Sequence, residues 1–153
     1  VGCVMGFSFQ DADNGWKAIG RAIDNARDRD VKVGVQSDAG GELVNVATWN
    51  EYGTKHIPAR SFVRSAIDKG VSEIARAAGE FGRRVLFNAE SQEVALGKLG
   101  LVVARKIQEQ IRSNVPPPNA PETIERKKSS KTLIDKGQLR QSIRHKVVDR
   151  SEP

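Results

Sequence analysis

Residues 47–64 read ATWNEYGTKHIPARSFVR, and this stretch sets the expected arrangement of the chain. Its first residues have helical spacing, but Gly53 suits the left-handed conformation that often ends a helix. Pro58 prevents a helix from running through it and favours an extended Ile57. A new helix can begin after Arg60. The stretch is therefore predicted to form a helix, a sharp elbow and a second helix.

Charged and aromatic side chains gather at this elbow. Glu51 is placed to form an ion pair with Arg60 or Arg64 across the turn. Tyr52 and Phe62 are expected to pack beneath the turn, with Phe62 as a core anchor. By composition alone, a surface loop with solvated charges is an equally good interpretation.

Two long helices are expected after the elbow. Apolar residues recur every three or four positions over residues 63–85 and again over residues 96–111. A break is expected at residues 88–92, and the second helix should stop at the Pro-rich cluster 114–118.

Strands are expected on either side of these helices. Residues 31–35 alternate apolar and polar, and residues 142–148 are predicted to be a final strand. A short strand is also predicted at residues 6–10, followed by an amphipathic helix at residues 14–29. Between Gly41 and the elbow a helix is favoured over a hairpin strand.

These elements predict an α+β fold, in which a small antiparallel or mixed sheet packs against two long helices. Residues 1–153 are expected to form a single domain. Residues 115–132 are rich in Pro, Ser and Lys and are expected to be an extended basic loop or arm.

Composition excludes several classes of protein. No apolar run reaches the length of a membrane span, and the lone Cys3 excludes an internal disulfide. Residues 1–9 lack the features of a secretory signal, and Met5 is a candidate native start. The formal net charge of +6 permits binding to nucleic acid or to an acidic protein surface, without deciding between them.

The elbow resembles a sequence pattern of known proteins. Asn-Glu-Tyr-Gly-Thr at residues 50–54, followed by Ile-Pro-Ala-Arg-Ser-Phe-Val-Arg at residues 57–64, is similar to a hallmark of tail-completion or neck proteins of long-tailed bacteriophages. That family is related to the minor tail protein Z group of phage lambda and lies near the virion-morphogenesis proteins of Mu-like phages. Ser61 stands where the family usually has a second Pro, which leaves the helix start less rigid.

Residues 120–143 carry a second, longer resemblance to the same family. The shared frame is Leu133, Ile134, Asp135, Gly137, Leu139, Arg140, Ser142 and Ile143. The chain departs from the family pattern at Lys128, Thr132 and Lys136, where the family usually has Gly, Pro and Thr. The two resemblances together span residues 44–148, and the first forty residues align with nothing known beyond a strand–helix–strand pattern. Asp135 is expected to cap a short helical turn.

The resemblance implies a structural protein that completes the tail top or neck so that head and tail join. It would work in the virion after assembly in the bacterial cytoplasm, as a homo-oligomeric ring beside other neck and tail proteins. No cofactor and no membrane contact are expected. Interface candidates come from the elbow and from the C-terminal segment: Glu51, Tyr52, Arg60, Phe62, Arg64, Arg126, Lys127, Lys128, Lys131, Asp135 and Arg140.

An enzyme is not expected. His56 and His145 lack the paired spacing of metal ligands, and Cys3 has no neighbouring base in the sequence. Ser129 and Lys131 suggest a Ser–Lys pair, but they lie in a basic, Pro-flanked stretch that is typical of a solvated loop. The glycines form no phosphate-binding loop.

A basic nucleic-acid-binding module is the alternative function. Residues 126–146 supply cations for phosphate contacts. They lack interleaved aromatic residues for base stacking, and they show no helix-turn-helix or zinc frame. Contact with an acidic neighbouring subunit is therefore the favoured use of this basic region.

Overall fold

The computed structural model describes residues 20–21, 23–24, 28–87, 89–134 and 137–150. The predicted strand at residues 6–10, the start at Met5 and the expected cap Asp135 lie outside the described residues. Of the predicted helix at residues 14–29, residues 20–21 and 23–24 are described, and they are helical.

The described elements mix helices with a two-stranded sheet, so the predicted α+β fold class is confirmed. In chain order they are β1 (Arg29–Val35), the short 3-10 helix η1 (Ser37–Ala39), α2 (Gly41–Tyr52), α3 (Phe62–Leu86), α4 (Gln92–Arg112), α5 (Pro121–Lys127), α6 (Gln138–Gln141) and β2 (Ile143–Asp149). The helix expected before the elbow, the two long helices and both strands of the small sheet are all present.

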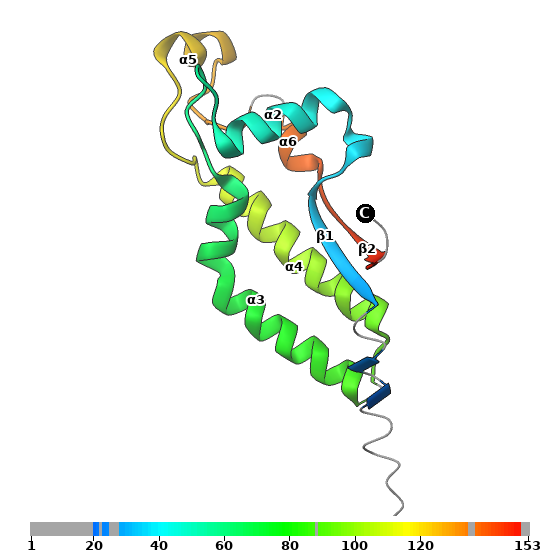
Figure 1. The fold of residues 1–153 in the computed structure, drawn as a ribbon. Helices are drawn as coiled ribbons and strands as arrows, with labels where there is room; N and C mark the ends of the chain where they lie inside the picture. Colours follow the sequence, from blue (N-terminus) through cyan, green and yellow to red (C-terminus); the bar gives the residue numbers. More distant parts are fainter. Residues whose placement is uncertain (1–19, 22, 25–27, 88, 135–136, 151–153) are drawn as a thin grey trace, which may run out of the picture.

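Helix α4 is the central element of the fold. Helix α3 packs along one side of α4, and the sheet packs on the other, while α2, α5 and α6 gather at one end (Figure 1). The buried residues of α4 are small in its first part and larger in its last part, and they contact both α3 and the sheet. Its buried positions are Ala95, Gly100, Ala104, Ile107, Gln110 and Ile111.

The two strands pair in an antiparallel register that places Val33 opposite His145 and Val35 opposite Ile143. His145 lies directly against α4 at Gly100, where a Cβ atom would be 2.7 Å from the Cβ and Cγ atoms of His145. Real Cβ atoms do not approach other heavy atoms so closely, and therefore only glycine at position 100 lets β2 come this near to α4.

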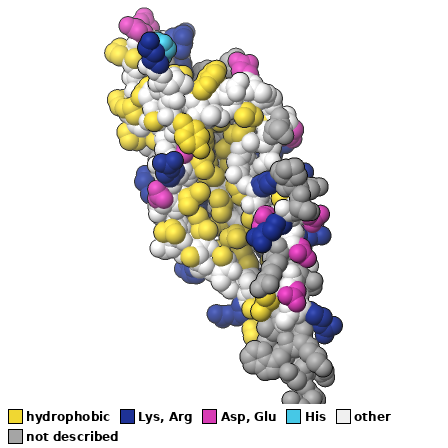
Figure 2. Space-filling view, in the orientation of Figure 1, with side chains coloured by type: hydrophobic (Ala, Val, Ile, Leu, Met, Phe, Trp, Pro, Cys, Tyr) yellow, Lys and Arg dark blue, Asp and Glu magenta, His cyan; other side chains and the backbone are white. Residues whose placement is uncertain are grey.

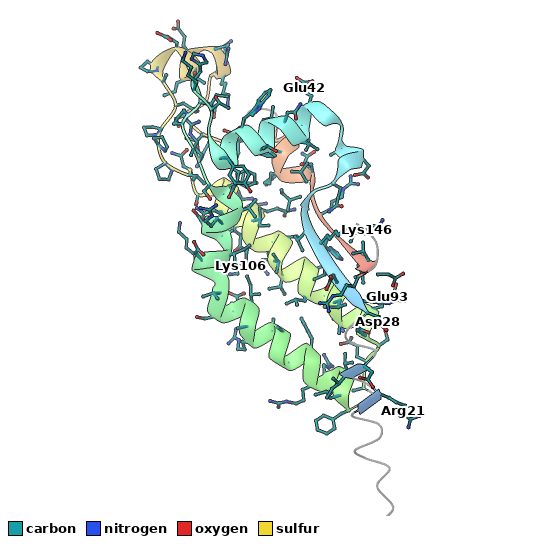
Figure 3. The ribbon with its side chains drawn as sticks, viewed as in Figure 1. Arg21, Asp28, Glu42, Glu93, Lys106 and Lys146 are labelled. Atoms are coloured by element: carbon teal, nitrogen blue, oxygen red, sulfur yellow. The ribbon has the colours of Figure 1, made fainter. Side chains whose placement is uncertain are left out.

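Helices α3 and α4 form an antiparallel hairpin joined at residues 87–91. Lys106 projects from α4 toward α3 (Figure 3), and its Nζ lies 2.6 Å from a carboxylate oxygen of Glu73. Lys69 of α3 also donates a hydrogen bond to Gln110 of α4 at 3.2 Å. Burial of Phe62, Ile107 and Ile111 supplies the apolar part of the contact.

One expectation for this fold needs correction. Residues 115–132 are not a purely extended arm, because they contain helix α5 and three buried side chains: Val115, Asn119 and Thr132. The segment leaves the end of α4 and returns to the core at Leu133. We call residues 113–132 the hook.

We expect Gly100→Ala to lower the free energy of unfolding by about 1–3 kcal/mol, because the added methyl group must push β2 away from α4. Gly79→Ala in α3 is the matched control, since a Cβ there meets nothing within 4 Å. The control should be stabilised by up to about 1 kcal/mol through higher helix propensity. Urea denaturation of both variants measures the difference, and equal effects would show that β2 has no close contact with α4.

Candidate functional site

Glu51 caps the start of helix α3 from the last turn of helix α2. Its two carboxylate oxygens accept hydrogen bonds from the backbone N–H groups of Phe62, Val63 and Arg64 at 2.8, 2.9 and 3.1 Å, and from the Ser61 hydroxyl at 2.7 Å. The first turn of α3 contains no acidic residue of its own. Glu51 therefore supplies both the acceptors and the negative charge that a helix N-terminus favours.

The elbow between α2 and α3 (residues 53–61) is a tightly folded turn. Gly53 has a φ of 79°, and a Cβ at this position would lie 2.9 Å from the backbone nitrogen of Ala59. Thr54 closes the turn with a bond from its N–H to the Ile57 carbonyl at 2.8 Å. The helix ends at Gly53 as predicted, but with a ψ of 169° the residue lies outside the predicted left-handed helical region. Its positive φ and the close backbone approach are what require glycine.

Arg60 connects the elbow to the hook. Its Nε donates a hydrogen bond to the Pro117 carbonyl at 2.8 Å, and its Nη2 donates one to the Pro118 carbonyl at 3.2 Å. The residue is only 7% exposed, and burial lowers the pKa of its guanidinium from the usual value. Arginine remains protonated in this environment, so both donors stay available to the two carbonyls.

Hydrogen bonds between its two ends close the base of the hook. The Asn119 amide donates to the Lys131 carbonyl at 3.1 Å, and the Thr132 N–H donates to Asn114 Oδ1 at 2.9 Å. Lys128 ends α5 in the left-handed conformation, with a φ of 52°. The basic hook is thus a folded projection that is attached to the core at both ends.

Two predicted contacts at the elbow are wrong. Among the described residues, no ion pair joins Glu51 to Arg60 or Arg64, because Glu51 binds the α3 N-terminus and Arg60 binds carbonyls of the hook. Arg64 contributes its backbone N–H and leaves its side chain exposed. Tyr52 is 70% exposed and does not pack beneath the turn, whereas Phe62 is 1% exposed, as expected of a core residue.

The remaining candidates lie on the hook and beside it. Arg126, Lys128 and Lys131 are exposed, and Lys127 is half-buried, with its Nζ 3.5 Å from the Thr132 carbonyl oxygen. Arg140 is half-buried on α6, and Asp135 is outside the described residues. The structure therefore brings Glu51, Arg60 and Phe62 together at the elbow and places the hook cations on a separate projection.

An apolar groove runs beside the elbow. It has a volume of about 450 Å³, and its apolar lining comes from β1, α2 and α3: Val35, Val44, Ala47, Tyr52, Phe62, Val63 and Ile67. Val71 follows Ile67 by one turn on the same face of α3 and is 56% exposed. Figure 2 shows a continuous band of hydrophobic side chains on this side of the molecule. Sequence periodicity placed Val63, Ile67 and Val71 on one face of the helix, but it did not show that part of this face is exposed.

Within the described ranges, no group of three or more His, Cys, Asp or Glu side chains is placed to hold a metal ion. No helix in this part of the chain is long and apolar enough to cross a membrane. No protein-family model, curated protein or solved structure matches the chain.

The Glu51 cap makes a pH-dependent contribution to stability. Burial by itself would raise the pKa of this carboxyl, but hydrogen bonds from Ser61 and from the N–H groups of Val63, Arg64 and Phe62 outweigh burial and lower the pKa from 4.5. A group with a lowered folded-state pKa stabilises the fold above its unfolded-state pKa. That contribution is lost as the pH falls through the folded-state value.

We expect Glu51→Gln to lower the free energy of unfolding at neutral pH by about 1 kcal/mol, the typical effect of losing a helix cap. The gap between the variant and the natural chain should narrow as the pH is lowered below 4.5. Denaturant titrations at several pH values measure this gap. Glu80→Gln, an exposed carboxylate change on the same helix, is the control. A gap that stays constant in acid would contradict the capping role.

Proposed function

We propose that this chain is a structural virion-assembly protein of a tailed phage or prophage, which completes the tail top or neck so that head and tail join. The observation that carries the proposal is the contact between Arg60 and the hook. Arg60 belongs to the first segment that resembles the family. The carbonyls of Pro117 and Pro118 lie just before the second segment, so Arg60 holds the chain close to the point where the second segment begins.

The residues of the shared pattern have roles in shape. Glu51 starts a helix, Gly53 permits a close turn, and Arg60 holds the hook. In the C-terminal segment, Leu133 and Leu139 belong to the core cluster. These residues stabilise the fold and leave other groups exposed on projecting surfaces. Such an arrangement suits a protein that acts by contacting other proteins.

The apolar groove supports self-association as part of this function. Contiguous exposed apolar surface on a small domain marks a contact surface, and the apolar groove together with Val71 forms such a surface. Identical subunits placed around a tail axis form a closed ring when one patch meets another by a repeated rotation. In the proposed ring, the apolar groove is covered by the neighbouring subunit.

We expect the purified chain to form a weak, concentration-dependent oligomer, and Ile67→Glu with Val71→Glu to abolish it, because the two carboxylates would be buried without partners. Sedimentation velocity over a concentration series measures the effect. Arg76→Glu on the exposed part of α3 is the control and should leave association unchanged. A tight dimer at every concentration, or a double variant that associates normally, would refute the ring through this groove.

The hook supplies the second contact surface. Its exposed cations Arg126, Lys128 and Lys131 lie on a projection beyond the packed core, next to the half-buried Lys127. Exposed charges contribute little to the stability of the fold, but opposite charges on a partner steer and orient association. The proposed partners are acidic surfaces of neighbouring neck or tail proteins.

We expect replacement of Arg126, Lys127, Lys128 and Lys131 by Ser to leave folding intact and to impair the joining of heads and tails. Electron microscopy of lysates from phage that carry the variant should show separated heads and tails. Replacement of Arg76, Arg83, Arg84 and Lys146 by Ser removes the same charge from exposed positions elsewhere and should give normal particles. Infectious particles from the hook variant would exclude the hook as an assembly contact, whereas loss of folding would make it part of the core.

DNA binding is the second candidate function, and the exposed cations of the hook favour it. A DNA-binding chain would bind mixed-sequence duplex DNA with an affinity that falls steeply as salt is raised. The virion-assembly proposal expects weak binding to duplex DNA, with no loss specific to the hook variant.

A further inference from the structure

An open cleft lies between α2, the hook and α6, on the side of α2 that the apolar groove does not use. Its volume is about 1110 Å³, which is larger than the apolar groove. Helices α2, α5 and α6 all lie at the same end of the molecule (Figure 1), and β2 reaches the cleft through Arg144 near its start. The cleft is thus formed by elements far apart in the sequence.

Among the described residues that line this cleft, cations outnumber carboxylates. Arg126 and Lys127 line it from α5, and Arg144 lines it from β2, where it faces Asp38 at 3.6 Å. Glu42 is the carboxylate among the lining residues, and Figure 3 shows it on α2. Arg60 also lines the cleft, but its Nε and Nη2 are bound to the hook. The cations of α5 and β2 are therefore the ones left to meet a ligand, although Arg144 also pairs with Asp38 and Lys127 also donates to the Thr132 carbonyl.

The cleft also has an apolar lining between these cations. The apolar members come from α2, the elbow, the segment after the hook and α6: Leu43, Val46, Ile57, Pro58, Leu133 and Leu139. Apolar surface beside separated cations fits a ligand that carries apolar and anionic groups along its length. A small inorganic anion would use only one of the cations and none of the apolar surface.

Thr132 adds a second observation. It lines the cleft and is 4% exposed, yet its Oγ1 has no hydrogen-bond partner in the part of the chain that the structure describes. A buried hydroxyl without a partner destabilises a protein, and nearly all buried polar groups are satisfied. A bound segment that displaces the atoms covering Oγ1 and brings a backbone polar group to it removes this penalty.

We propose that the cleft binds an extended, acidic segment of another protein. The carboxylates of this segment pair with Arg126, Lys127 and Arg144, and its apolar side chains contact the apolar lining of the cleft. Charge complementarity favours an acidic ligand, and the apolar lining of the cleft favours a polypeptide over a nucleic acid. Among the described lining residues there is no Phe, Tyr or Trp, and the ring of His56 alone offers little surface on which a run of bases could stack. The inference rests on the proposed function only for the source of the segment, a neighbouring virion protein.

A labelled peptide of alternating Glu and Leu is the probe, and a Lys–Leu peptide of the same length is its charge-reversed control. Fluorescence anisotropy should show saturable binding of the Glu–Leu peptide to the full chain. Replacement of Arg126, Lys127 and Arg144 by Ser should weaken binding about tenfold, as expected for three exposed charge pairs. Replacement of Arg76, Arg83 and Arg84 by Ser, which removes the same charge outside the cleft, should leave binding unchanged.

The variant Thr132→Val distinguishes binding in the cleft from general electrostatic attraction between the peptide and the protein. The change removes the orphaned hydroxyl and keeps the volume, so the melting temperature should stay equal or rise while peptide affinity falls. A variant that folds well and binds less tightly cannot be explained by loss of structure, and it would place the peptide against Thr132.

Several results would overturn the inference. The inference fails if the cleft and control triple variants lose the same peptide affinity, or if both peptides bind equally well. It also fails if Thr132→Val binds the peptide as tightly as the natural chain, or if inorganic phosphate or duplex DNA displaces the peptide. If the peptide fails to bind while the hook variant still separates heads from tails, the cleft inference fails and the proposed function stands. If the peptide binds as expected but heads and tails join normally in the hook variant, the proposed function fails instead.

Discussion

The arrangement of this protein depends on one carboxylate placed at the start of a long helix. Glu51 ends α2 and binds the first N–H groups of α3, so the two helices meet at a fixed point although nine residues separate them. With that point fixed, the side chain of Arg60 is directed toward the hook, and α2 and α3 together form the walls of the apolar groove. The two opposite charges of the elbow serve different neighbours instead of each other.

Local patterns predicted much of the fold. Helical periodicity placed the two long helices, alternation placed the strands, and Gly53 with Pro58 placed the elbow. Helix α5 was missed because a seven-residue helix in a Pro- and Lys-rich stretch is marginal alone and depends on its surroundings. Sequence periodicity grouped Val71 with Val63 and Ile67, but periodicity reports which residues share a face and not which face is covered, and Val71 is exposed.

The candidate site was predicted only in part, since its decisive contacts join residues that are far apart in the chain. Arg60 was recognised as important, but its partners lie more than fifty residues away and are backbone carbonyls, which no side-chain pattern reveals. Glu51 was predicted to pair with Arg60 or Arg64 because these cations lie just across the turn in the sequence. The signal that would have found its true partners is the absence of any acidic residue in the first turn of α3.

Because hydrogen bonds close the hook at its base, the length of its tip has little effect on the stability of the core. The bonds from Asn119 to Lys131 and from Thr132 to Asn114 hold the two ends of the hook, while Lys128 and Ser130 beyond them are exposed. Lengthening a closed loop costs only about 0.6 kcal/mol for each doubling of its length. The tip is therefore a place where a tag or a fluorophore can be inserted with little effect on the stability of the core.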